Sequence, residues 1–182
     1  MDATLNVAPT STKNRDKVRD PEMHTSQKGN KWCFGMKAHI GVDVDSRLVR
    51  SVHGTSGHSS DNVEIDPLQH GEEAFAFGDA GYKRFKNRAD VKTDVTRRVV
   101  MRPGKRSALA KYDKTHALLK QEEKLKTSVR AKVEHPFLVI KCQFDFVKVR
   151  YRGLKRSTVQ LFTLFAQFNL WMTRSNLAEV KV

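Results

Sequence analysis

Cysteine and long apolar runs are scarce in this chain of 182 residues. Its two cysteines, Cys33 and Cys142, have neither the paired spacing of a zinc site nor the density of a disulfide-stabilised secreted domain. No stretch reaches the roughly 18 consecutive apolar residues that cross a bilayer, and the first residues do not form a secretory signal. We therefore expect a cytoplasmic protein in a reducing compartment, without structural zinc or a membrane span.

Negative charge is also under-represented, with 20 Asp and Glu against 34 Lys and Arg. The resulting net charge of +14 and a pI near 10.0 are typical of proteins that bind a polyanion. Nucleic acid is the leading partner class, and an anionic membrane surface is the alternative. The length allows one domain with a core of its own, so we expect residues 1–182 to form a single domain.

Apolar periodicity predicts an α/β fold. Strict alternation from Phe34 to Val42 is typical of a strand with one buried face, while 3.6-residue periodicity marks two later helices. The expected elements are a first strand at 2–8, a basic loop at 13–31, an antiparallel hairpin at 33–53, a central strand at 74–79, a helix at about 114–134 and a C-terminal helix at about 157–175. Shorter helices are expected at 61–71 and 82–90, and a further strand at 97–101.

Two features of this outline bear on function. Pro136 cannot donate a backbone hydrogen bond and disfavours helix at the preceding residue, so the first long helix should kink or end just past Glu134. The basic loop at 13–31 is long for a connection without regular structure, and such loops either bind something or are disordered. The sequence favours DNA contact and disorder equally for this loop.

The most informative stretch runs through residues 74–82, where a short apolar run stops at Asp79 and a glycine turn. Apolar runs of this length are typical of buried strands, and open α/β sheets carry their chemistry beyond the carboxyl ends of such strands. Asp79 is therefore a candidate catalytic residue. Taken alone, the position favours a cap of the turn or of a following helix over a catalytic role, since Asp is preferred at both places.

Asp2 and Glu134 are the other two carboxylates at meaningful places, on the first strand and at the expected helix break. Three carboxylates repel one another and are costly to desolvate, so a bound cation would give them a reason to cluster. Oxygen ligands suit Mg²⁺ or Mn²⁺, and two such ions about 3.5–4 Å apart can catalyse phosphoryl transfer. In a chain this basic, the expected substrate is a nucleic-acid phosphodiester.

Two cations accompany Glu134. Arg130 precedes it by four residues on the same helical face, and Lys141 follows it by seven. A surface ion pair between Arg130 and Glu134 would be worth only about 0.3–0.5 kcal/mol. For a basic helix taken by itself, the spacing favours this structural interpretation.

The order of several motifs resembles the catalytic half of bacterial insertion-sequence transposases of the DDE class, the IS-five-type group. The resemblance covers essentially the whole chain. It rests on Asp2-Ala3-Thr4, Pro9 with Ser11-Thr12-Lys13, Arg19-Asp20-Pro21-Glu22-Met23-His24, Lys28-Gly29-Asn30, the stretch 34–43, Phe77-Gly78-Asp79-Ala80-Gly81-Tyr82, the stretches 101–106 and 130–137, the stretch 148–154, and Asn169-Leu170-Trp171.

This resemblance implies a ribonuclease-H-like mixed sheet flanked by helices. Asp2, Asp79 and Glu134 match the family's metal-binding catalytic triad, which implies Mg²⁺ (or Mn²⁺) as cofactor. The implied reaction is DNA nicking followed by attack of a DNA 3′-hydroxyl on target DNA. The implied partners are element ends and target DNA, with a homodimer in the synaptic complex and a nucleoid-associated location in a bacterial cytoplasm.

The resemblance also implies DNA-contacting residues. Arg130, Glu134 and Lys141 match three of the four positions of the family's Tyr-Arg-Glu-Lys signature, and the tyrosine position falls on Thr127. In the family, the arginine and lysine are expected to hold DNA phosphate near the cut. Two further candidates for DNA contact are Lys37 and Arg150.

At the front of the chain we expect a truncated first strand, because only Met1 precedes Asp2. Terminal residues are poorly ordered unless they are tied down, so Asp2 should lie on a frayed end. Three alternatives follow: a truncated element, the second half of a split reading frame, or a fragment that needs its missing half in trans. The alternative function is an inactive remnant that only binds DNA through its basic surface. A general ribonuclease is a third, weaker hypothesis, since the motifs that flank the carboxylates match transposases.

Overall fold

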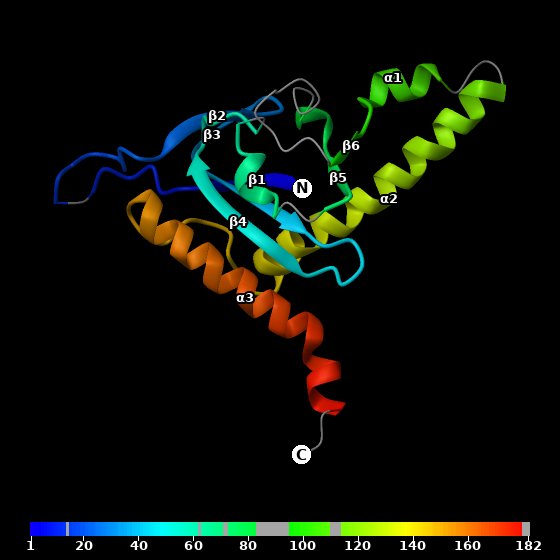
Figure 1. Ribbon diagram of the computed structural model, residues 1–182. Coiled ribbons are helices and arrows are strands. Elements are labelled where there is room, and N and C mark those ends of the chain that lie inside the picture. Colours follow the sequence, from blue (N-terminus) through cyan, green and yellow to red (C-terminus); the bar gives the residue numbers. More distant parts are fainter. Residues whose placement is uncertain (14, 62, 71–72, 83–94, 110–113, 180–182) are drawn as a thin grey trace.

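The computed structural model describes residues 1–182 with the exception of 14, 62, 71–72, 83–94, 110–113 and 180–182 (Figure 1). All strands precede the α-helices along the described chain. The elements are β1 (Asp2–Val7), β2 (His24–Lys28), β3 (Lys31–Val42), β4 (Val49–Ser56), the 3₁₀ helix η1 (Asp66–Leu68), β5 (Phe75–Gly78), β6 (Thr96–Val99), α1 (Pro103–Ala108), α2 (Lys114–Cys142) and α3 (Leu154–Glu179).

Strand β3 is the centre of a four-stranded antiparallel sheet, in which it pairs with β1, β2 and β4. Ile40 lies opposite Asp2 on one side and Val52 on the other. The alternation in the sequence correctly predicted both the strand and its hairpin with β4. Met36, Ala38 and Ile40 point to one face and are fully buried, as side chains two apart in a strand must share a face.

Within the described part of the chain, the strands form two sheets and not the single mixed sheet that the resemblance implied. Strands β5 and β6 pair in parallel as a separate two-stranded sheet, with Phe75 opposite Thr96. Their link to β1 is the amino group of Met1, which donates a 2.7 Å hydrogen bond to the carbonyl of Phe77. The backbone of β1 is instead paired with β3 along its length, so the α/β class is right and the arrangement of its strands differs.

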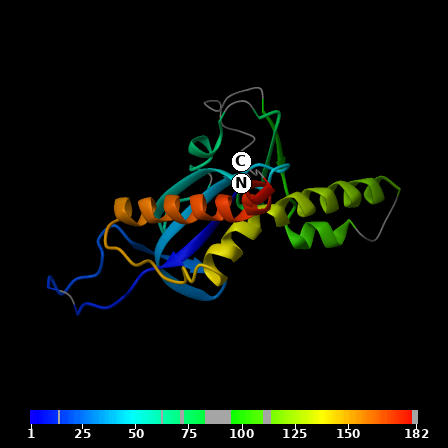
Figure 2. The ribbon, with the colours of Figure 1, turned by 90° about the horizontal axis from the view of Figure 1, so that it is seen from below.

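Helices α2 and α3 cover one face of the antiparallel sheet, and α3 crosses that face in the view from below (Figure 2). Gly54 on β4 allows this close packing, because a Cβ there would lie 2.2 Å from the Oγ1 of Thr158 on α3. The core between sheet and helices contains Met36, Ala38, Ile40, Val133, Phe137, Ile140, Phe146, Leu161, Phe165 and Phe168. None of the helices within the described ranges is long and apolar enough to span a membrane.

Helix α2 continues beyond the expected end at about 134 and contains Pro136 within it. The prediction of a helix end at this proline was wrong, because tertiary packing compensates for the missing hydrogen bond. Pro136 is buried, and Phe137 and Ile140 beyond it are only 7% and 0% exposed in the core. Most helical stability in proteins comes from such an apolar face rather than from local propensity. Glu134 therefore lies within the helix and not at its terminus.

The other expected bounds differ in smaller ways. The loop at 13–31 contains strand β2, which pairs with the start of β3, so the prediction of a continuous loop was wrong. The expected helix at 61–71 is reduced to η1, while the expected strand at 97–101 corresponds to β6, shifted by a residue or two. The expected C-terminal helix begins three residues earlier, directly after Gly153, whose φ of +90° only glycine adopts readily. The helix expected at 82–90 lies almost entirely outside the described residues.

The side-chain amide of Asn169 on α3 binds the edge of β4. Its Oδ1 accepts a 2.9 Å hydrogen bond from the amide of Val49, and its Nδ2 donates a 2.8 Å hydrogen bond to the Val49 carbonyl. Both backbone groups of Val49 are thus satisfied by one side chain, as a neighbouring strand would satisfy them. This contact fixes where α3 lies along β4.

We expect Asn169→Ala to lower the free energy of unfolding by about 1–3 kcal/mol, because it leaves a partly buried N–H and C=O of Val49 without partners. Urea titration followed by circular dichroism measures this change. Gln167→Ala, on the exposed side of the same helix, is the control and should change stability by less than about 0.5 kcal/mol. Equal effects of the two substitutions would contradict the structural role of the amide.

Candidate active site

Asp79 follows directly after β5, at the start of a 3₁₀ turn through Ala80–Tyr82. Its carboxylate accepts a hydrogen bond from the amide of Ala80, and its carbonyl accepts a 2.9 Å hydrogen bond from the amide of Tyr82. Asp79 therefore does stabilise the turn, as the structural interpretation of the sequence expected. Its side chain is also 34% exposed, and the turn aims it at helix α2.

The guanidinium of Arg130 on α2 joins two of the three candidate carboxylates. Its Nη1 lies 3.5 Å from Oδ1 of Asp79, and its Nη2 lies 3.0 Å from Oε1 of Glu134, one turn further along the helix. Glu134 is half-exposed, whereas Arg130 is about one-third exposed. The Nε of Arg130 is buried and has no hydrogen-bond partner among the described residues. Arg130 thus does more than form a surface pair, since it bridges β5 and α2.

Asp2 completes the group from the start of β1. Burial raises the pKa of its carboxyl above 3.8, the hydrogen bond from the Ala3 amide and the positive charge of Arg130 lower it, and the negative charge of Asp79 raises it. These interactions place Asp2 within electrostatic reach of both residues. The expectation of a frayed end was wrong, because the buried Met1 amino group is bound to β5 and burial lowers its pKa to about 6.

One face of α2 lies along β1 and carries the residues of the expected signature. Arg130, Glu134 and Lys141 are spaced by four and seven residues, which places them on one side of a helix. The Nζ of Lys141 donates a 2.6 Å hydrogen bond to Oγ1 of Thr4, and Thr4 shares a face of β1 with Asp2. The structure therefore brings Asp2, Asp79, Arg130, Glu134 and Lys141 together from β1, β5 and α2.

Three carboxylates are a suitable donor set for Mg²⁺ or Mn²⁺, which prefer oxygen ligands. In this structure, Asp79 and Glu134 pair with the Arg130 guanidinium, which lies between them, and not with a metal ion. Among the residues that the structure describes, no group of three or more His, Cys, Asp or Glu side chains is arranged to hold a metal ion. The set fits a divalent cation chemically, provided that the Arg130 side chain turns away.

The two other candidate DNA-binding residues lie elsewhere. Lys37 is on the opposite face of the sheet, where its Nζ donates hydrogen bonds to the Ser59 carbonyl at 2.7 Å and to Oδ1 of Asp61 at 3.0 Å. Its ammonium is largely engaged within the protein. Arg150 is exposed, and it donates a 3.1 Å hydrogen bond to the Asp145 carbonyl. DNA contact by either residue stays a prediction.

Sequence reasoning singled out Lys37 but missed the polar layer around it. His39 is fully buried, its Nε2 lies 2.8 Å from Oγ1 of Thr55, and burial lowers its pKa to about 4. Asp61 lies 4.0 Å from the other ring nitrogen, and the Glu64 carboxylate pairs with His53 at 3.1 Å. The alternation along β3, which places Lys37 and His39 on one face, was the available signal.

Tyr82 connects this layer to the candidate site. Its ring is 1% exposed and packs against Gly78, and its hydroxyl has no hydrogen-bond partner among the described residues. Burial raises the pKa of Tyr82, and the nearby carboxylates of Asp61, Asp2 and Asp79 raise it further. The tyrosine therefore lies between two groups of carboxylates and keeps its proton.

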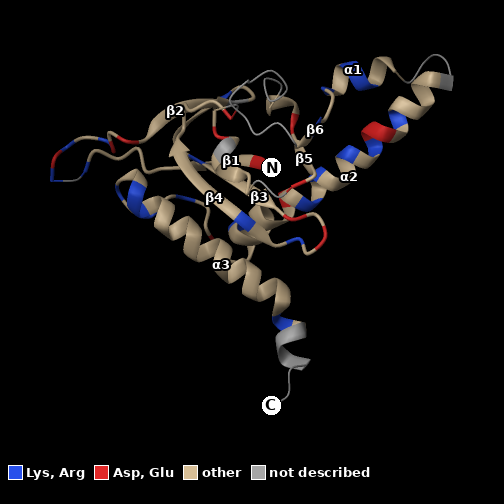
Figure 3. Ribbon diagram, viewed as in Figure 1, with Lys and Arg blue, Asp and Glu red and all other residues tan. Residues whose placement is uncertain are grey.

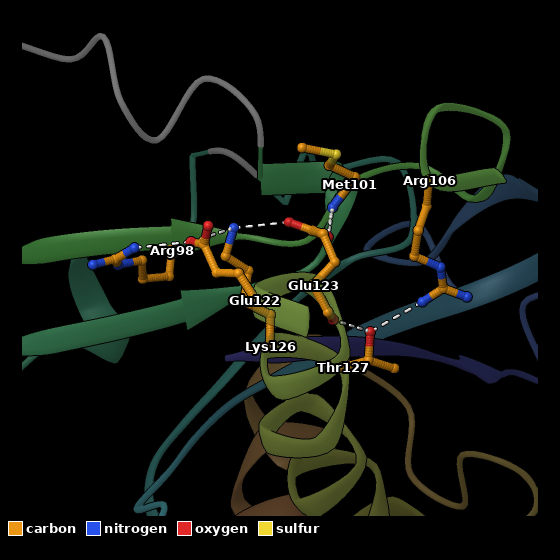
Figure 4. A network of polar contacts seen from close by, with 7 residues as sticks. All are labelled: Arg98, Met101, Arg106, Glu122, Glu123, Lys126 and Thr127. Carbon is orange, nitrogen blue, oxygen red and sulfur yellow. Dashed lines mark hydrogen bonds and ion pairs between the residues drawn. The ribbon is translucent and has the colours of Figure 1, made fainter. Parts of the chain in front are cut away.

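A network of polar contacts fastens α2 to β6 and α1 upstream of the site (Figure 4). Glu123 is 1% exposed, and its carboxylate accepts 2.8 Å hydrogen bonds from the Met101 amide and from Nζ of Lys126. One turn on, Thr127 accepts a 3.1 Å hydrogen bond from Arg106 on α1. Thr127, at the tyrosine position of the expected signature, thus has a structural partner.

The comparison with protein-family models identifies one family. The model described as "Transposase DDE domain" matches residues 1–170, which is most of the chain. No solved structure matches the chain significantly.

We expect Glu123→Ala to lower the free energy of unfolding by about 3–5 kcal/mol, because it leaves Lys126 and the Met101 amide without their buried acceptor. Glu122→Ala removes the neighbouring carboxylate, which is 41% exposed, and should cost at most about 1 kcal/mol. Guanidinium titration of both variants measures the difference. A loss of the same size in both would argue against a buried anchor at Glu123.

We expect Asp2→Asn to raise the thermal midpoint at pH 7 in the presence of EDTA, because burial makes the ionised carboxylate of Asp2 unfavourable. A folded-state pKa above 3.8 means that the folded protein binds this proton more tightly than the unfolded chain. The advantage of the variant should therefore shrink as the pH falls through the raised pKa towards 3.8. Calorimetry between pH 7 and pH 3.5 tests this.

Asp45→Asn, at an exposed position of the β3–β4 loop, is the matched control and should leave the midpoint unchanged. A lower midpoint for Asp2→Asn at pH 7 would show that attraction to Arg130 outweighs the cost of burial.

Proposed function

The chain belongs to the family of transposase DDE domains, whose function is DNA transposition, and on this premise we propose that it nicks DNA and transfers the resulting strand by metal-dependent phosphodiester chemistry. The observation that carries the proposal is the meeting of Asp2, Asp79 and Glu134, from three separate elements, around the guanidinium of Arg130. Such carboxylates have no structural reason to lie together unless a cation compensates their charge.

In this proposal Asp2, Asp79 and Glu134 hold Mg²⁺ or Mn²⁺. When bound, such ions activate an attacking oxygen and stabilise the leaving oxygen of a phosphodiester. The protein's own contribution is position: pairing with β3 holds β1, the core holds α2, and the hydrogen bonds of the turn after β5 fix Asp79. Rigid elements keep ligands more accurately placed than loops do.

Arg130 and Lys141 would bind the phosphates that flank the reacting bond. Both side chains lie on the α2 face that follows β1, so they can reach the same stretch of DNA backbone. The N–H groups of Arg130 that pair with the two carboxylates cannot bind a phosphate at the same time. We infer that its guanidinium turns from Asp79 and Glu134 to the phosphate when metal and DNA bind.

The subgroup, the DNA partners and the oligomeric state are proposed from the sequence motifs that resemble insertion-sequence transposases. We propose that the chain serves an insertion sequence of the IS-five-type group, and that its DNA partners are element ends and target. A ribonuclease-H-like relation among β1, β5 and α2 would explain why these three elements meet at the carboxylates. A second copy in the synaptic complex is a further part of this proposal.

A second function, DNA binding without cleavage, is favoured by one specific observation. The Arg130 guanidinium lies where the carboxylates would share a metal ion, and the described residues present no ready-made metal site. If Arg130 stays there, the chain is a DNA-binding remnant held by its basic surface.

We expect the purified chain to nick supercoiled or element-end DNA in the presence of Mg²⁺ or Mn²⁺ and to lose this activity in EDTA. Asp79→Asn and Glu134→Gln should each lower the nicking rate by roughly two orders of magnitude or more, as loss of electrostatic stabilisation at a reacting centre does. A gel assay of nicked circles over time measures both effects.

Glu122→Gln is the matched control, because it removes the same charge from α2 twelve residues, or about 18 Å, before Glu134. It should nick at the wild-type rate. Unchanged nicking by the Asp79 and Glu134 variants would refute the proposed site, and wild-type binding without any metal-dependent nicking would favour the remnant.

A further inference from the structure

A strongly basic surface lies away from the candidate active site. It forms where residues 13–22, here called the arm, meet the segment before α3. Residues 13–22 and 145–156, here called the basic arm surface, contain nine Lys and Arg but only four Asp and Glu. All nine cationic side chains are exposed. The arm projects to the side of the molecule opposite α1 and the start of α2 (Figures 1 and 3).

The carboxylates of the arm are directed towards the segment that begins α3. Asp16 pairs with Arg152 at 3.0 Å, and Asp20 accepts a 2.6 Å hydrogen bond from the amide of Gly153. Glu22 accepts a hydrogen bond from the amide of Leu154, the first residue of α3. Carboxylates are favoured at this place because the free N–H groups and dipole of a helix N-terminus attract negative charge.

Because these carboxylates are bound to the start of α3, the acidic and basic side chains of the arm have different roles. The acidic side chains of the arm hold it against the body of the protein, and the basic ones remain at the surface. Eight exposed cations of this surface have no acidic partner among the ion pairs of the described residues: Lys13, Arg15, Lys17, Arg19, Lys148, Arg150, Lys155 and Arg156. Because the N-terminus of α3 already holds the protein's own carboxylates, an external anion would have to bind these side chains.

The position of the surface relates it to the candidate active site. The amide of Val149 donates a 2.9 Å hydrogen bond to the carbonyl of Val7, at the end of β1 remote from Asp2. A strand rises about 3.4 Å per residue, so Val7 lies about 17 Å from Asp2. That span is about five base pairs of B-DNA, or roughly half a helical turn.

We propose that the basic arm surface binds the phosphate backbone of duplex DNA about half a turn from the reacting phosphodiester. The inference rests on the proposed function, which locates the reacting phosphodiester at the carboxylates. The choice of DNA as partner rests on the positive charge of the surface. A duplex with one phosphate at the carboxylates, lying along β1, brings its backbone to residues 13–19 and 148–156. This contact is independent of the base sequence, and it increases the affinity for DNA through release of counterions.

The test measures the salt dependence of binding to a 30-base-pair duplex by fluorescence anisotropy in EDTA, with the full chain. Each neutralised phosphate contributes about 0.9 to the slope of log K against log salt. The triple substitution Lys13→Gln, Arg15→Gln, Lys17→Gln should make this slope shallower by about 2–3. A second triple variant at Lys148, Lys155 and Arg156 should do the same, and circular dichroism checks that both variants fold.

The matched control removes three exposed cations from the opposite side of the molecule, with Lys105, Lys120 and Lys124 each changed to Gln. This control has the same net charge as the arm variants and should keep the wild-type slope. An unchanged slope in both arm variants, or an equally large change in the control, would overturn the proposal. Tighter binding to an RNA duplex of the same sequence than to DNA would also overturn it.

Because binding is measured without metal, its outcome is independent of the nicking assay. A shallower slope in the arm variants combined with absent nicking would support this surface and refute catalysis. Nicking with an unchanged slope would support catalysis and refute this surface.

Discussion

Charge compensation by Arg130 is the interaction that allows carboxylates from β1, β5 and α2 to lie close together. Asp2, Asp79 and Glu134 come from these three elements, and the Arg130 guanidinium is the cation that the structure supplies between two of them. Glu123, fixed to the Met101 amide, and Lys141, bound to Thr4, hold α2 in place on either side of this point. The position of the helix is thus set by polar contacts as well as by its apolar stripe.

Acidic residues are few in this chain, and many of the described ones are used internally. Glu123 and Asp20 accept backbone hydrogen bonds at element junctions, and Asp61 pairs with Lys37 beneath the sheet. Each of these carboxylates is committed to a partner inside the protein. The net charge of +14 is also unevenly spread along the chain, since the basic arm surface contains nine Lys and Arg against four Asp and Glu.

Local pattern in the sequence predicted the elements whose local and tertiary preferences agree. The alternation along β3 and the apolar run that ends at Asp79 were enough to predict β3 and β5, the second of which ends directly before Asp79. Pro136 misled the prediction because its burial in the core outweighs its local effect on the helix. The pairing of Lys37 with Asp61 was equally hidden, since it depends on a loop that returns across the sheet.

The side-chain amide of Asn169 not only fixes α3 but also occupies the edge of β4. A strand at the border of a sheet presents unpaired N–H and C=O groups, and these can recruit a strand from another molecule. At Val49 both groups are already bound to the asparagine side chain. The amide thereby acts as a stop against intermolecular strand addition at this end of β4, which helps to keep a folded chain from aggregating.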